Sequence, residues 1–92
     1  MTRTAWRDPR GELVSNASLR AVAEARLAEG VSLESMQLRV SSSGDARGLA
    51  RALGLTPEVR RNGKRYTRTR IWSGTAAKLC RAVGVAPVEV GL

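Results

Sequence analysis

The stretch Val31–Gly54, VSLESMQLRVSSSGDARGLARALG, carries the pattern that decides the fold. Its apolar residues recur at the three- and four-residue spacing of one buried helix face, first over 33–40 and again over 46–53. The small polar residues 41–44 between these runs favour a turn. The sequence therefore predicts a short helix of about nine residues, a turn, and a further helix over 43–54.

Capping residues mark the ends of these two helices. Ser32 can accept a hydrogen bond in the first turn of the shorter helix, and Ser43 or Asp45 can do the same for the longer one. If the longer helix buries its apolar stripe, Arg47 and Arg51 lie four residues apart on its outer face. That pair is a candidate surface for reading a duplex. The buried stripe of the longer helix consists of Ala46, Leu49, Ala50 and Leu53.

Two more helices are expected on either side of this stretch. One begins near Asn16 or Ser18 as the cap, and the other begins near Ser73 or Thr75 and stops at Gly84. The buried stripe of the first consists of Leu19, Val22, Ala23 and Leu27. The buried stripe of the last consists of Ala76, Leu79, Cys80 and Val83.

The chain of 92 residues supports one modest aliphatic core and hence one domain. We expect an extended N-terminal arm over 1–16, with Trp6 docking on the core, and a helical domain over 17–92 that carries a basic wing at 56–74. The apolar tail 85–92 either packs on the body or joins a dimer interface. The fold class expected is mainly α, with about four helices and a two-stranded β-hairpin.

Residues 59–66, VRRNGKRY, place Asn-Gly between two short strands, which favours a hairpin with a two-residue turn. That turn would set Arg61 opposite Lys64 and Arg60 opposite Arg65, and like charges across a strand pair repel. A row of phosphates would reverse the sign of this interaction. The hairpin is therefore interpreted as a basic wing on a nucleic-acid backbone.

The second strand can continue beyond the hairpin. Alternation along it would place Arg68, Arg70 and Trp72 on the same face as Tyr66, and Ile71 on the other. Either face could be the one that binds.

The charge is concentrated in one segment. Of 16 Lys and Arg residues against 8 Asp and Glu residues, six basic and no acidic side chains lie within 59–74. An excess of this sign points to an acidic partner, with nucleic acid as the first candidate and an anionic membrane surface as the second, while the alternative is a merely solvated face. The candidate DNA-binding residues are Ser43, Arg47, Arg51, Arg60, Arg61, Lys64, Arg65, Arg68 and Arg70.

Several function classes are excluded by what the chain lacks. It has no His and only one Cys, so His-based acid–base catalysis, Cys/His zinc sites and intrachain disulfides are impossible. The eight carboxylates form no convincing pair, so we expect neither an enzyme nor a cofactor, metal or small-molecule substrate. No apolar run approaches the roughly 20 residues that cross a bilayer, and no signal peptide is recognised, so we expect a cytoplasmic protein without membrane contact.

The order of the predicted helices is that of a helix-turn-helix domain. The sequence resembles the XRE, or Cro/repressor-type, family in VSLESM at 31–36 and in KLCRAVGV at 78–85 followed by PVEV at 87–90. The resemblance covers 17–54 and 75–90. It implies that helix 43–54 enters the major groove with Arg47 and Arg51 on guanine or phosphate, and that the protein binds palindromic sites as a homodimer.

Two features depart from that family. The turn holds Ser41–Ser43 where the family usually has a glycine followed by an aliphatic residue, and the basic insertion 56–74 looks more like the wing of winged-helix or excisionase-type proteins. The expected function is sequence-specific binding of double-stranded DNA by a transcriptional regulator, either a repressor or a phage-type control factor. Two alternatives stay open: an RNA-binding protein in which Tyr66 or Trp72 stacks on bases, and a module that docks on an acidic protein.

Overall fold

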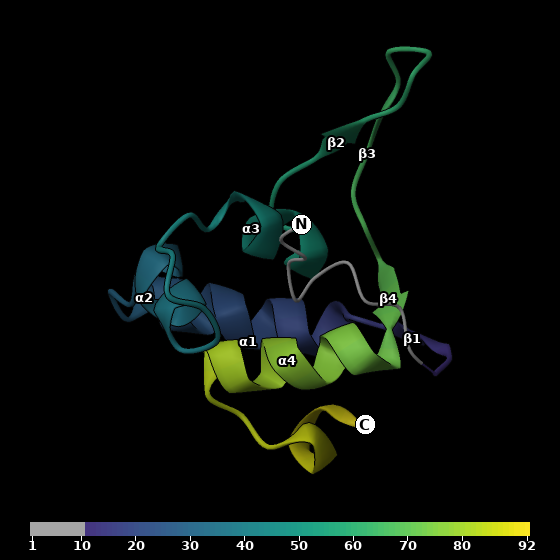
Figure 1. Ribbon diagram of the computed structural model, residues 1–92. Helices are drawn as coiled ribbons and strands as arrows, with labels where there is room; N and C mark the ends of the chain where they lie inside the picture. The colour runs from purple at the N-terminus through teal and green to yellow at the C-terminus, as the bar shows by residue number, and fades with distance from the viewer. Residues whose placement is uncertain (1–10) are drawn as a thin grey trace.

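The computed structural model describes residues 11–92, so the expected docking of Trp6 lies outside the described part. The elements in chain order are β1 (Leu13–Ser15), α1 (Ala17–Ala28), α2 (Leu33–Leu38), α3 (Arg47–Leu53), β2 (Glu58–Val59), β3 (Arg65–Tyr66), β4 (Arg70–Trp72), α4 (Ser73–Val83) and a 3-10 turn, η2 (Pro87–Val90). The fold is mainly α with four α-helices and a projecting hairpin (Figure 1), which confirms the expected fold class.

Helix α4 is the centre of the core, where it packs against α1, α2, β1 and β4. The core cluster is almost entirely aliphatic and consists of Leu19, Ala23, Met36, Leu49, Ala52, Leu53, Ile71, Ala76, Leu79, Cys80, Ala82 and Val83. The helical stripes predicted from spacing are mostly buried, but Leu27, in the last turn of α1, is 37% exposed. The tail is split: Val90 packs on the core, whereas Val88 is 78% exposed.

The segment expected to be an extended arm contains a strand. β1 pairs antiparallel with β4, in the register Leu13 with Trp72, Val14 with Ile71, and Ser15 with Arg70. Ile71 is 3% exposed and Trp72 is 42% exposed, so the inner face of this two-stranded sheet covers the core and the outer face is open. The sequence predicted a strand through Arg70 and Trp72 but missed its partner β1, because a three-residue strand shows too little alternation to detect.

The helical stretch 31–54 folds with different bounds from those predicted. Ser32 caps α2 as expected, accepting from the backbone N–H of Ser35 at 3.1 Å, but α2 has 6 residues and ends at Leu38. Helix α3 begins at Arg47 with Ala46 at its N-cap, so the prediction that Ser43 or Asp45 caps it is wrong.

Local side-chain turns explain the late start of α3. The Oγ atom of Ser41 accepts from the N–H of Ser43, the Oγ of Ser43 from the N–H of Asp45, and Oδ1 of Asp45 from the N–H of Arg47. These short polar side chains satisfy the backbone in a non-helical path. Ser43 therefore lies in the connection between α2 and α3, and the prediction that it belongs to a helix over 43–54 is wrong.

The N-termini of α1 and α4 also lack the side-chain caps that the sequence predicted. Asn16 is the N-cap residue of α1, but its side chain makes no capping bond and Ser18 is exposed within the helix. Trp72 is the N-cap residue of α4, without a side-chain cap, in place of Ser73 or Thr75. Gly54 and Gly84 end α3 and α4 in the left-handed conformation, as predicted.

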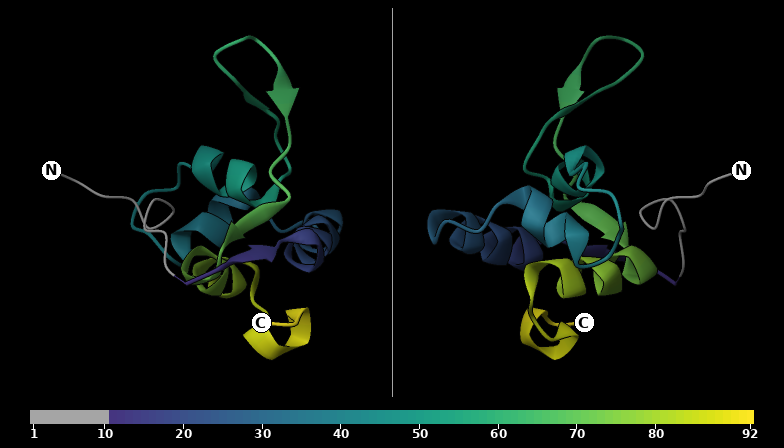
Figure 2. Two further views of the ribbon diagram at one scale, coloured as in Figure 1. Left: turned by 90° about the vertical axis from the view of Figure 1, so that its right-hand side faces the viewer. Right: turned by 60° about the vertical axis from the view of Figure 1, so that its left-hand side comes forward.

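The hairpin stands clear of the helices in every view (Figures 1 and 2). Its register is Glu58 with Tyr66 and Val59 with Arg65, and the N–H of Arg60 donates to the carbonyl of Lys64 at 2.8 Å. Gly63 has φ 81° and donates to the carbonyl of Arg60, which makes a three-residue loop with a left-handed glycine. The predicted two-residue turn is therefore wrong by one residue, and Arg60 faces Lys64.

Candidate nucleic-acid interface

Four cations crowd the end of the hairpin farthest from the helices. Arg60, Arg61, Lys64 and Arg65 are all exposed, and within residues 11–92 none of them pairs with a carboxylate. The guanidinium of Arg60 lies over the Tyr66 ring, 4.5 Å from its centroid, which is a cation–π contact that leaves the charge in place. The structure thus brings together four of the predicted site residues on a projecting ribbon.

Arg68 is not free as the charge pattern suggested. Its Nε and NH2 groups donate to the two carboxylate oxygens of Glu58 at 3.1 and 2.7 Å, in a bidentate pair at the base of the hairpin. The Glu58 side chain is only 16% exposed. Glu58 lies one residue before the basic segment 59–74. That segment contains no carboxylate in the sequence, but in the fold one of its arginines pairs with Glu58.

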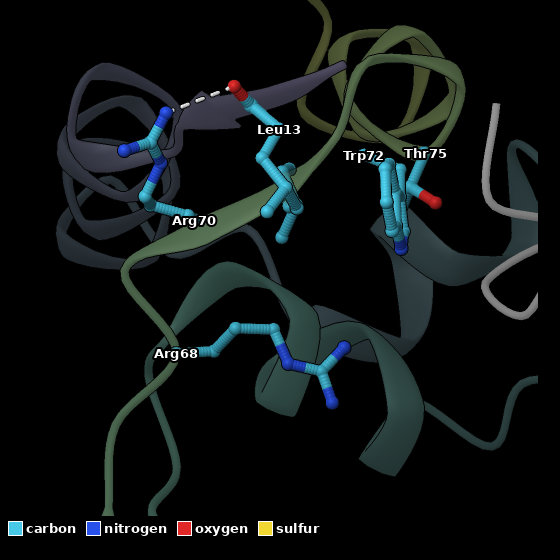
Figure 3. A pocket seen from close by; sticks show the side chains of 6 residues that line it. Leu13, Arg68, Arg70, Trp72 and Thr75 are labelled. Carbon is cyan, nitrogen blue, oxygen red and sulfur yellow. Dashed lines mark hydrogen bonds between the residues drawn. The ribbon is translucent and has the colours of Figure 1, made fainter. Parts of the chain in front are cut away.

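Arg70 is anchored to the backbone of the neighbouring strand. Its NH2 group donates to the carbonyl of Leu13 at 3.1 Å, as Figure 3 shows. Together with Arg68, Trp72 and Thr75, these residues line a shallow cavity of about 280 Å³ beside the β1–β4 sheet (Figure 3). Arg70 keeps its charge and its exposure, so it extends the positive surface from the hairpin toward the body.

Arg47 forms an ion pair with Asp45, which the sequence predicted only as a helix cap. Its Nε and NH2 groups donate to Asp45 at 3.0 and 2.7 Å, and both side chains are largely exposed. This hydrogen bond lowers the pKa of the Asp45 carboxyl from its ordinary value of 3.8 to about 2. An exposed pair of this kind is worth little and is screened by salt, so a phosphate can displace Asp45.

Arg51 lies on the outer side of α3, one turn after Arg47, as predicted. Both line a groove of about 510 Å³ between α3 and the start of α2, together with Leu33 and Glu34. The groove is therefore mixed in charge. The connection 39–46 that forms part of its rim is several residues longer than the roughly three- to four-residue turn of a helix-turn-helix.

Comparison with protein-family models, with curated proteins and with solved structures finds no match for this chain. In the part of the chain that the structure describes, no three His, Cys, Asp or Glu side chains gather where they could hold a metal ion. None of the helices within residues 11–92 is long and apolar enough to cross a membrane.

Two arginines to which the charge pattern gave no role form hydrogen bonds to the C-terminal end of α4. Arg26 donates to the carbonyls of Val83 and Gly84 at 3.0 and 3.3 Å, and Arg39 donates to that of Ala82 at 3.3 Å. These bonds satisfy the last carbonyls of α4 and place positive charge at the negative end of its dipole. No signal in the sequence identifies them, because the partners lie more than forty residues away along the chain.

Proposed function

We propose that this protein binds double-stranded DNA, and that the hairpin 58–66 holds the sugar-phosphate backbone. The observation that carries the proposal is the set of four exposed cations, none of them paired with a carboxylate within residues 11–92, at the end of a ribbon that projects beyond the helices. This arrangement does not stabilise the folded protein, since like charges across a strand pair repel. A polyanion with evenly spaced charges attracts this cluster, and the cations that reach its phosphates release counterions.

A second surface supplies the discrimination between sequences. Helix α3 is short, but its outer side presents Arg47 and Arg51 one turn apart. Arginine side chains at this spacing can reach base edges or phosphates in a major groove. Arg47 must leave Asp45 to contact the DNA. Because their ion pair is exposed, breaking it costs little free energy.

The role as a repressor or phage-type control factor, acting as a homodimer in the cytoplasm, belongs to the same proposal and rests on the family resemblance. The long connection 39–46 means that α2 and α3 need not cross the duplex as a standard helix-turn-helix does. The hairpin therefore carries more of the proposal than the α2–α3 pair.

The test is a fluorescence-anisotropy titration of the intact protein against a random-sequence duplex and a structured RNA at several salt concentrations. Each hairpin cation that contacts a phosphate contributes about −1 to the slope of log K against log salt on the duplex. Changing Arg60, Arg61, Lys64 and Arg65 together to Ala is expected to abolish most of that slope on every sequence.

A matched pair of single variants separates contact from net charge. Arg61→Ala and Arg81→Ala each remove one exposed arginine, the first from the hairpin and the second from α4. Only Arg61→Ala is expected to reduce the slope, by about one. Tighter binding to the RNA would move the protein to the RNA-binding class, and no binding to either nucleic acid at low salt would overturn the proposal in favour of an acidic protein partner.

A further inference from the structure

The two faces of the hairpin differ in the contacts that their side chains make within the chain. We infer that the face bearing Val59 and Arg65 is the one that lies against the nucleic acid, while the face bearing Arg60, Lys64 and Tyr66 points away from it. This inference rests on the proposed function and specifies which atoms perform it.

The register and two side-chain contacts assign the faces. Side chains alternate along a strand, so Glu58 and Arg60 share one face with Tyr66 and Lys64 of the opposite strand. The cation–π contact of Arg60 with Tyr66 and the ion pair of Glu58 with Arg68 both lie on this side. We call it the closed face; Val59, Arg65 and Thr67 form the open face.

The closed face is already occupied by contacts within the chain. The guanidinium of Arg60 is stacked on Tyr66, and the guanidinium of Arg68 donates two hydrogen bonds to Glu58. The Glu58 carboxylate would also face any phosphate placed there, and its repulsion offsets part of the attraction of the neighbouring cations. A polyanion therefore gains less on this side than the count of its cations suggests.

The open face has the complementary composition. Arg65 is exposed and no hydrogen bond or ion pair within residues 11–92 engages its guanidinium, and Thr67 beside it is also exposed. Val59, directly across from Arg65, is 63% exposed although nothing in the fold requires an apolar side chain there. A guanidinium beside a small apolar group suits a nucleic-acid backbone, where phosphates alternate with the apolar surface of the sugars.

The experiment compares two neighbours in the chain. Lys64→Ala and Arg65→Ala each remove one exposed cation from the hairpin, but Lys64 lies on the closed face and Arg65 on the open one. On a random duplex at fixed salt we expect Arg65→Ala to weaken binding about tenfold and reduce the salt slope by about one, and Lys64→Ala to weaken it less than about threefold with the slope unchanged. Equal losses, or a larger loss for Lys64→Ala, would overturn the inference.

Val59→Ser tests the apolar part of the face. Because Val59 is largely exposed, this change leaves the thermal unfolding of the free protein unchanged while removing contact with the sugars, and binding should fall about threefold. An unchanged affinity would limit the open face to its cation and contradict the role given to Val59. Failure of the proposed function itself reads differently, since the unmodified protein would then not bind the duplex at all.

Discussion

The amide of Asn16 donates a hydrogen bond of 2.9 Å to the backbone carbonyl of Ala52, across 36 residues of sequence. The same Nδ2 group donates to the carbonyl of Arg68 at 3.2 Å, and the Asn16 N–H donates to the carbonyl of Thr69 at 3.1 Å. One fully buried residue thus joins the start of α1, the end of α3 and the connection between β3 and β4. Asn16 therefore ties the segment below the hairpin to two helices.

Asn16→Ala is expected to destabilise the fold by about 2 kcal/mol, because it leaves two carbonyls without their donor in a buried site. Urea denaturation monitored by circular dichroism measures the loss. Ser18→Ala is the control, since Ser18 is exposed on the same helix and its side chain makes no hydrogen bond to any other residue of 11–92. An equal effect of both variants would mean that Asn16 contributes only helix propensity.

Gly54 is constrained by its backbone and by its surroundings. It has φ 77°, and a Cβ at this position would collide with the carbonyl oxygen of Arg68. Gly54→Ala is therefore expected to cost about 3 kcal/mol or more. Gly30→Ala is the matched control, because Gly30 also has positive φ, 95°, but open space around its Cβ, so its cost is about 1 kcal/mol. Similar midpoints for the two variants in a urea titration would contradict the predicted collision.

Arg26 is expected to stabilise the C-terminus of α4 through its hydrogen bonds to Val83 and Gly84. Arg26→Ala should lower the free energy of unfolding by about 1–2 kcal/mol, since the carbonyls lose their donors and the helix end loses a cation. Arg81→Ala removes a charge from the last turn of the same helix without these bonds, and should cost less than about 0.5 kcal/mol. Thermal unfolding of both variants at equal salt makes the comparison, and the prediction fails if the two melt together.

The Asp45–Arg47 pair gives the stability a small acid dependence. Because the pKa of Asp45 falls from 3.8 unfolded to about 2 folded, its contribution is present above about pH 4 and is lost as the pH falls toward 2. The difference in stability between the unmodified protein and Asp45→Asn should therefore shrink over that window. The pair is exposed, so added salt should shrink the difference as well. A difference that grows below pH 4 would contradict the assignment.

Cys80 is expected to be inert in the folded protein. It is 1% exposed within the core, and burial raises the pKa of its thiol, so little thiolate is available. A thiol reagent such as a disulfide-exchange probe should react only at the rate at which the fold opens, and rapidly in denaturant. Fast labelling under native conditions would show that α4 leaves the core readily.

The helical stripes were predictable because helix periodicity is a local property. Leu19, Met36, Leu49, Leu79 and Val83 are all buried at the positions that three- and four-residue spacing selects. The hairpin was also predictable from Asn-Gly, but its register was not, because Asn-Gly serves both a two-residue loop and a three-residue loop with a left-handed glycine.

The candidate site was predictable as a region but not as a set of free charges. Arg60, Arg61, Lys64 and Arg65 stay exposed and without a carboxylate partner within the described residues 11–92, whereas Glu58 takes Arg68 and Asp45 takes Arg47. Glu58 and Arg68 meet only because the strands pair in one register, and a shift of one residue would send their side chains to opposite faces.

The sequence by itself determined the fold class, the four helices, the helix stops at Gly54 and Gly84, and the concentration of positive charge in 59–74. These follow from spacing, backbone conformation and charge, which act within a few residues. Only the tertiary structure decided the pairing of β1 with β4, the role of Asn16, and which cations remain free. Those outcomes depend on groups far apart in the chain, whose contacts exist only after the core has closed.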